Sequence, residues 1–153
     1  MKTQAGVDRL KKLLSIVTSC SKWGLFTRPL TQNWGRGRIQ LIGDAAHAML
    51  PNAGQGACQA FEDAYILARW LEACADPVEA FANFRRIRIP RVHGVQRLSI
   101  ANARFKHMRD KAVQKESITS GKGSVHGNSD WVWGYDPIGD WDKEPIVPNA
   151  YAA

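Results

Sequence analysis

The sequence predicts an α/β chain in which helices predominate and strands are few and short. The apolar run 38–42 has the length and composition of an interior strand, and a Gly-Asp pair follows it directly. From Gly56 onward, apolar residues recur instead at spacings of three and four, which is typical of helices. The pattern therefore changes from strand to helix across the turn region 43–55.

The N-terminal region predicts one helix and one further strand. Residues 3–19 favour an amphipathic helix, because one helical face gathers the apolar side chains Val7, Leu10, Leu14 and Val17. A secretory signal is the alternative, but the apolar run is short, broken by Ser and Thr, and preceded by Asp8. Residues 23–26 have the composition of a strand.

Two long helices are expected after the turn region. The first carries an apolar repeat that we expect to face the core, namely Ala57, Ala60, Phe61, Ala64, Leu67, Ala68 and Leu71. The second begins at Asp76-Pro77, an N-cap followed by proline at the first helical position. Pro90 predicts a kink or break within it. Residues 117–129 resemble a linker, and the Trp-rich tail after them is expected to pack its aromatic rings onto the protein.

Composition sets broad limits on function. The chain has 153 residues and a formal charge of +7, with the excess between Arg85 and Lys115. No apolar run approaches the roughly 20 residues of a membrane span, and the three cysteines lack metal-ligand spacing and indicate a cytoplasmic setting. The basic region leaves nucleic-acid binding open as an alternative. A solvated helix face explains most such runs, so no nucleic-acid partner is expected.

The turn region contains the parts of a binding site for a polar cofactor. Asp44 follows a strand, where its carboxylate can accept hydrogen bonds from paired sugar hydroxyls, and Gly43 lets a ligand approach the backbone. The segment Gly54-Gln55-Gly56-Ala57-Cys58 opens a helix, whose unpaired amides and dipole favour negative charge. Singly, each part is also ordinary turn or cap chemistry. His47 has neither a nucleophile nor a metal partner nearby, so no catalytic or metal-binding residue is assigned.

The combination resembles the flavin-dependent aromatic hydroxylases, the group that contains salicylate hydroxylase and para-hydroxybenzoate hydroxylase. The matching residues are Arg36–Ile39, Leu41–His47, Pro51, Gly54–Ala57 and Glu62–Ala64, with weaker similarity over Phe84–Arg91 and Asp130–Asp136.

The resemblance implies an α/β, Rossmann-like ancestry and an FAD site. Asp44 would bind the ribityl chain of FAD, Pro51 would lie beside the flavin ring, and the amides of Gly56, Ala57 and Cys58 would meet its pyrimidine edge. It also implies NAD(P)H as reductant and a flavin hydroperoxide that hydroxylates a small aromatic substrate.

The resemblance also implies a division of the chain. Residues 1–30 would be the trailing edge of a substrate domain, 31–112 the C-terminal part of the FAD-binding domain, and 113–153 a linker and Trp-rich tail. The family's G-x-G-x-x-G loop is absent, so the chain looks like the C-terminal third of a hydroxylase. Ile39, Leu41 and Leu67 should then be partly uncovered. A complementing chain or N-terminal portion would supply the rest, and a non-catalytic remnant or binding module is the alternative.

Overall fold

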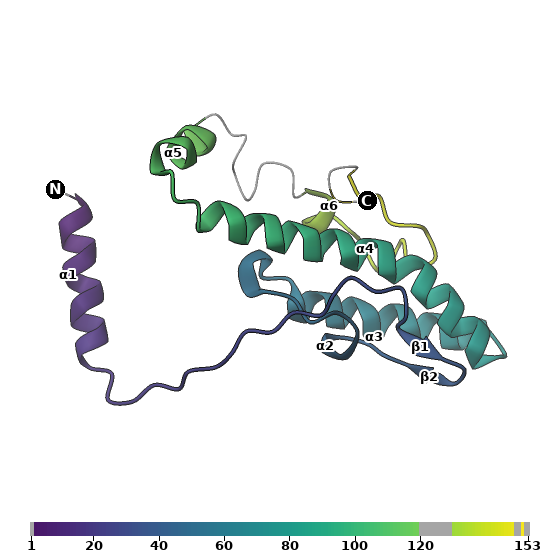
Figure 1. The fold of residues 1–153 in the computed structure, drawn as a ribbon. Helices are drawn as coiled ribbons and strands as arrows, with labels where there is room; N and C mark the ends of the chain where they lie inside the picture. The colour runs from purple at the N-terminus through teal and green to yellow at the C-terminus, as the bar shows by residue number, and fades with distance from the viewer. Residues whose placement is uncertain (1, 120–129, 149–150, 152–153) are drawn as a thin grey trace.

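The computed structural model describes residues 2–119, 130–148 and 151 (Figure 1). The helices are α1 (Lys2–Ser15), α2 (Asp44–His47), the 3-10 turn η1 (Pro51–Ala53), α3 (Gly56–Ala73), α4 (Pro77–Lys106), α5 (Lys111–Thr119) and α6 (Asp130–Trp133). The strands are β1 (Gly35–Arg36) and β2 (Ile39–Gln40). Figure 1 shows α3 and α4 lying side by side as the centre of the fold, with α1 apart from them.

The β structure is smaller than the sequence predicts. β2 covers only part of the expected strand 38–42 and pairs antiparallel with β1 in a hairpin, with Gly35 opposite Gln40 and Arg36 opposite Ile39. The hairpin turns at Gly37, whose φ of 55° suits glycine. The prediction of an interior strand is therefore wrong within the described residues, because β2 has a neighbour on one side only. The predicted strand 23–26 is also wrong, since these residues form no ladder.

The core lies between α3, α4 and the chain just before β1. Trp34 is fully buried, and its ring centroid lies 6.2 Å from that of Phe84 on α4. Ile66 from α3 and Ile87 from α4 complete the centre of this cluster. Burying such side chains stabilises the chain by about 1.5–3 kcal/mol each. The α3–α4 pair is therefore the rigid body on which the turn region is built.

Helix α4 begins as predicted and continues further than predicted. The Asp76 carboxylate accepts a hydrogen bond from the Val78 amide at 3.0 Å, and Pro77 is the first helical residue. The helix then runs without a break through Pro90 to Lys106. Ile89 and Val92 are buried on either side of this proline. Of the predicted kink or break, the break does not occur, because tertiary packing outweighs the lost backbone hydrogen bond there.

Helix α3 turns a different face to the core from the one its apolar repeat predicts. Ala57, Phe61, Ala64, Ala68 and Leu71 are all exposed, and we call this stripe the α3 outer face. Phe61 is 76% exposed. The buried face instead carries Gln59, Asp63 and Ile66. Most of the apolar repeat is thus uncovered. Ile39 is 67% exposed and Leu41 and Leu67 are half-buried, in keeping with the expectation that these three are partly uncovered.

The C-terminal tail folds back over α3 and α4, and its aromatic residues are mostly packed. The rings of Trp141 and Trp70 meet edge to face at 5.0 Å, and Trp131 stacks on Tyr151 at 5.8 Å. Trp133 is the exception, with most of its surface exposed. The predicted linker at 117–129 falls largely outside the described residues. Among those described, no helix has both the length and the apolar character needed to cross a membrane.

Phe84 is buried in this core and Phe61 is exposed, so the two residues provide a test of the packing. Phe84→Ala should lower the free energy of unfolding by about 3–5 kcal/mol, because it opens a cavity in the centre of the cluster. Phe61→Ala on the α3 outer face should change it by less than about 0.5 kcal/mol. Urea unfolding of both variants measures the difference, and equal losses would contradict this packing.

Candidate functional site

A pocket of about 570 Å³ lies where α2, η1 and the start of α3 meet. It is lined by Asp44, Met49, Leu50, Pro51, Gly54, Gly56, Ala57 and Ala60. The predicted site residues Asp44, Pro51, Gly54, Gly56 and Ala57 are thus brought to one pocket, although eleven residues lie between Asp44 and Gly56.

The other predicted residues lie beside this pocket and do not line it. Gly43 directly precedes Asp44 in the chain. Its φ is 56°, and a Cβ added to it would lie 3.5 Å from Cβ of Ala60. Gln55 is buried, and its Oε1 accepts a hydrogen bond of 3.3 Å from Nε2 of Gln59. Cys58 is exposed. Gly43 and Gln55 therefore adjoin residues that line the pocket without lining it themselves.

The N-terminus of α3 offers hydrogen-bond donors to the pocket. Gln55 is the N-cap residue and makes no side-chain cap, and its carbonyl accepts the first helical hydrogen bond, from the Gln59 amide at 2.9 Å. The amides of Gly56, Ala57 and Cys58 consequently have no acceptor within the helix. The helix dipole adds positive potential at the same point.

The glycines leave room for a ligand at these donors. A Cβ added at Gly54 or Gly56 would meet no described atom within 4 Å. Gly54 has φ 65°, which ends η1 in a left-handed conformation and turns the chain into α3. The pocket thus combines an exposed carboxylate, free amides and open space. This combination fits a polar ligand with hydroxyl groups and an electron-rich edge.

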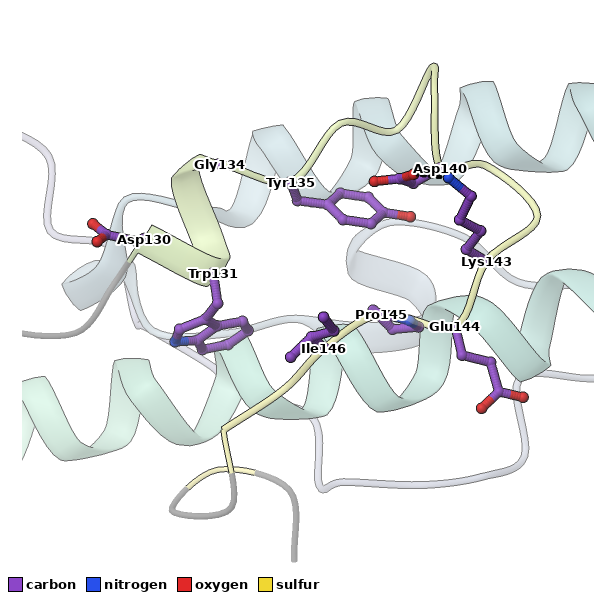
Figure 2. Close-up of a pocket in the computed structure, with 9 residues that line it drawn as sticks. All are labelled: Asp130, Trp131, Gly134, Tyr135, Asp140, Lys143, Glu144, Pro145 and Ile146. Carbon is purple, nitrogen blue, oxygen red and sulfur yellow. Dashed lines mark hydrogen bonds and ion pairs between the residues drawn. The ribbon is translucent and has the colours of Figure 1, made fainter.

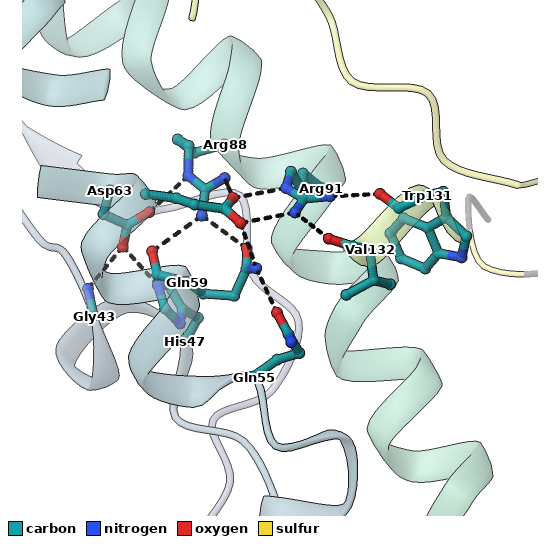
Figure 3. A network of polar contacts seen from close by, with 10 residues as sticks. Gly43, His47, Gln55, Gln59, Asp63, Arg88, Arg91, Trp131 and Val132 are labelled. Atoms are coloured by element: carbon teal, nitrogen blue, oxygen red, sulfur yellow. Dashed lines mark hydrogen bonds and ion pairs between the residues drawn. The ribbon is translucent and has the colours of Figure 1, made fainter. Parts of the chain in front are cut away.

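A buried polar network joins α2, α3 and α4 (Figure 3). Asp63 is fully buried on α3, and its carboxylate accepts hydrogen bonds from the Gly43 amide at 2.9 Å, His47 Nε2 at 2.7 Å and Arg88 Nε at 2.8 Å. A carboxylate accepts and cannot donate, so the Asp63 contact fixes Nε2 of His47 as the protonated nitrogen. His47 therefore acts as a structural hydrogen-bonding group, as its sequence context indicates.

Glu62 extends the network to the C-terminal tail. Its carboxylate pairs with Arg88 and binds Arg91 in two bonds of 2.7 Å, from Nε and Nη2. Arg91 also donates to the carbonyls of Trp131 and Val132, at 3.0 Å each, and its guanidinium lies 3.9 Å above the ring centroid of Tyr135. Arg88 and Arg91 are buried in these contacts, so they add nothing to a basic surface.

The network lowers the pKa of both carboxyl groups. Burial alone would raise the pKa of Asp63, but the hydrogen bond from His47 and the charge of Arg88 outweigh it and hold the pKa below its ordinary value of 3.8. Burial likewise opposes ionisation of Glu62, and Arg91 and Arg88 lower its pKa below 4.5. Sequence reasoning did not single out these acids as a network. The one signal was Glu62-Asp63 on α3 matched by arginines three residues apart on α4.

A second pocket, of about 480 Å³, lies in the tail (Figure 2) and shares no lining residue with the first. Its lining residues are Asp130, Trp131, Gly134, Tyr135, Asp140, Lys143, Glu144, Pro145 and Ile146. Its charged groups are largely paired, Lys143 with Asp140 and Glu144 with Arg86. Across the described part of the chain, no cluster of His, Cys, Asp and Glu has the arrangement of a metal site.

Comparison with known proteins finds a family and relatives that match this chain. The family described as "FAD binding domain" matches residues 7–98. The chain is 35% identical over 132 residues to 3-amino-4-hydroxybenzoate 2-monooxygenase PtmB3 of Streptomyces platensis, covering 84% of this chain and 33% of that protein. It is 34% identical over 136 residues to a salicylate hydroxylase of Pseudomonas putida, covering 86% and 31%.

A third relative is 6-hydroxynicotinate 3-monooxygenase of Bordetella bronchiseptica, 34% identical over 146 residues, with 94% of this chain and 32% of that protein covered. The chain therefore spans about a third of the length of the curated relatives it matches.

The lowered pKa values predict acid sensitivity. A carboxyl group with a lowered pKa in the folded state stabilises fully above its ordinary pKa, and this contribution is lost as the pH falls through the folded value. The free energy of unfolding, measured by urea titration, should therefore fall as the pH drops below about 4.5. Glu62→Gln should flatten this dependence, whereas Glu144→Gln at the exposed pair with Arg86 should leave it unchanged. If the free energy of unfolding depended on pH in the same way in the wild type and in both variants, Glu62 would not be the source of the acid sensitivity.

Proposed function

Because the chain belongs to the FAD-binding domain family of the flavin-dependent aromatic hydroxylases, we propose that it forms the part of such a monooxygenase that holds the ribityl chain and pyrimidine edge of FAD. The observation that supports this proposal is the single pocket shared by Asp44 and the free amides of α3. A carboxylate and a helix N-terminus suit opposite parts of the same cofactor.

Each side of the pocket has its own role in the proposal. Asp44 accepts hydrogen bonds from the ribityl hydroxyls. The amides of Gly56, Ala57 and Cys58 donate to the pyrimidine edge, where the α3 dipole stabilises negative charge. Gly54 and Gly56 permit close approach of the backbone, and Pro51 borders the pocket beside the ring system.

The relatives support a proposal for the reaction of the whole protein. When bound, FAD supplies the oxygen-activating chemistry of hydroxylation, with NAD(P)H as the source of electrons. Relatives are named for activity on salicylate, 3-amino-4-hydroxybenzoate and 6-hydroxynicotinate, so the proposed substrate is a small aromatic ring that carries a hydroxyl group. This chain contributes positioning and electrostatic field for the cofactor.

The α3 outer face favours a site completed by further polypeptide. The stripe begins at Ala57, which also lines the pocket, and continues over Phe61 to Leu71. Exposed apolar stripes of this kind mark interaction surfaces. We propose that the remaining part of the FAD-binding domain covers this face, in the same or another polypeptide. Such a covering would also form a second wall of the cofactor pocket.

FAD titration of the full chain tests the proposal, followed by flavin fluorescence. Gly56→Leu would fill the open space at the amides, so FAD affinity should fall at least about tenfold while stability changes by less than about 0.5 kcal/mol. Asp44→Asn should weaken binding about 10- to 150-fold, because it removes hydrogen bonds to a charged acceptor.

The matched control is Asp142→Asn, an exposed aspartate of the tail, which should leave binding unchanged. Absence of FAD binding by the wild-type chain at high micromolar concentration would instead support the alternative, a non-catalytic remnant or binding module. Equal losses in Asp44→Asn and Asp142→Asn would reject Asp44 as the ribityl ligand.

A further inference from the structure

We propose that Asp63 is a positioning residue that holds the Gly43–Asp44 turn in the conformation that presents Asp44 to the cofactor. This inference rests on the proposed function of Asp44, but its central observation concerns the chain alone. Asp63 does not line the pocket and is fully buried behind it.

The geometry shows Asp63 bound to both ends of the short helix α2. Its Oδ2 accepts a hydrogen bond from the amide of Gly43, the N-cap residue, and another from Nε2 of His47, the last helical residue. Asp44 lies between these two attachment points. A single buried oxygen atom on α3 therefore fixes the segment that carries the cofactor carboxylate.

Helix α2 depends on this attachment because it has little stability of its own. It is four residues long, and its N-cap residue, Gly43, has no side chain with which to cap it. A single helical turn is unfavourable in isolation, since ordering its backbone costs more than its few hydrogen bonds return. The φ of 56° and ψ of −144° at Gly43 set the direction of the chain as it enters the helix.

The other oxygen of Asp63 is anchored independently. Oδ1 accepts a hydrogen bond of 2.8 Å from Nε of the buried Arg88, whose guanidinium also binds Gln59 and Glu62. The Arg88 charge keeps the carboxylate ionised and its plane fixed. Asp63 is thus oriented by α4 and in turn orients α2, which places the pocket carboxylate relative to the amides of α3.

Glu62 provides a matched control. It is the adjacent acid, it binds the same Arg88, and none of its hydrogen bonds reaches α2. Asp63→Asn and Glu62→Gln each neutralise one buried carboxylate without changing its shape. A role limited to the stability of the ion-pair network predicts the same behaviour for both variants, whereas a positioning role predicts a local effect at α2 only for Asp63→Asn.

The experiment is amide hydrogen exchange by NMR on the full, FAD-free chain. In the wild type the Gly43 amide should exchange at least about tenfold more slowly than its intrinsic rate, because its hydrogen bond to a buried carboxylate must open first. In Asp63→Asn this protection should be lost at Gly43, beyond any change in global stability. In Glu62→Gln it should persist after correction for global stability.

Unprotected Gly43 in the wild type would overturn the proposal, and so would equal loss of protection in the two variants. If Asp63→Asn does not fold, an unprotected Gly43 amide in the wild type still overturns the proposal. FAD titration adds a second readout, in which Asp63→Asn should raise the Kd at least about fivefold more than Glu62→Gln. Failure of all chains to bind FAD would reject the proposed function, while the exchange data would still test the positioning role.

Discussion

The buried ion pairs between α3 and α4 are the constraint on which the rest of this structure depends. Asp63 and Glu62 on one helix face Arg88 and Arg91 on the other, with both arginines out of contact with solvent. Charges removed from water are tolerated only when every partner is in place. The arrangement therefore allows very little freedom in how α3 and α4 pack, and it fixes the rotation of α3 about its own axis.

That rotation explains two features that otherwise look unrelated. Turning Asp63 inward brings its carboxylate to Gly43 and His47, which places α2 at the pocket. It also turns Phe61 outward and leaves the α3 outer face uncovered. Arg91 extends the same network to the carbonyls of Trp131 and Val132, so the tail is held by the helix pair that supports the pocket.

The sequence predicted the helix starts correctly where they depend on neighbouring residues. The N-cap of α4 at Asp76 and the start of α3 at Gly56 depend on neighbouring residues, and both lie where the pattern predicts. At Pro90, where a kink or break is predicted, the helix does not break, because packing on both sides holds it together. The prediction of an interior strand was wrong because a strand depends on its partners. Among the described residues β2 has only one neighbouring strand.

The sequence by itself predicted the family and its cofactor, because the Gly43-Asp44 pair and the Gly54–Cys58 helix start together resemble the flavin-dependent aromatic hydroxylases. It also predicted that apolar positions would lack cover. Only the tertiary structure decided which face of α3 is buried. Periodicity assigns the core to the apolar stripe, whereas paired charges on α3 and α4 can be satisfied only by facing each other, and this requirement turned the polar face inward.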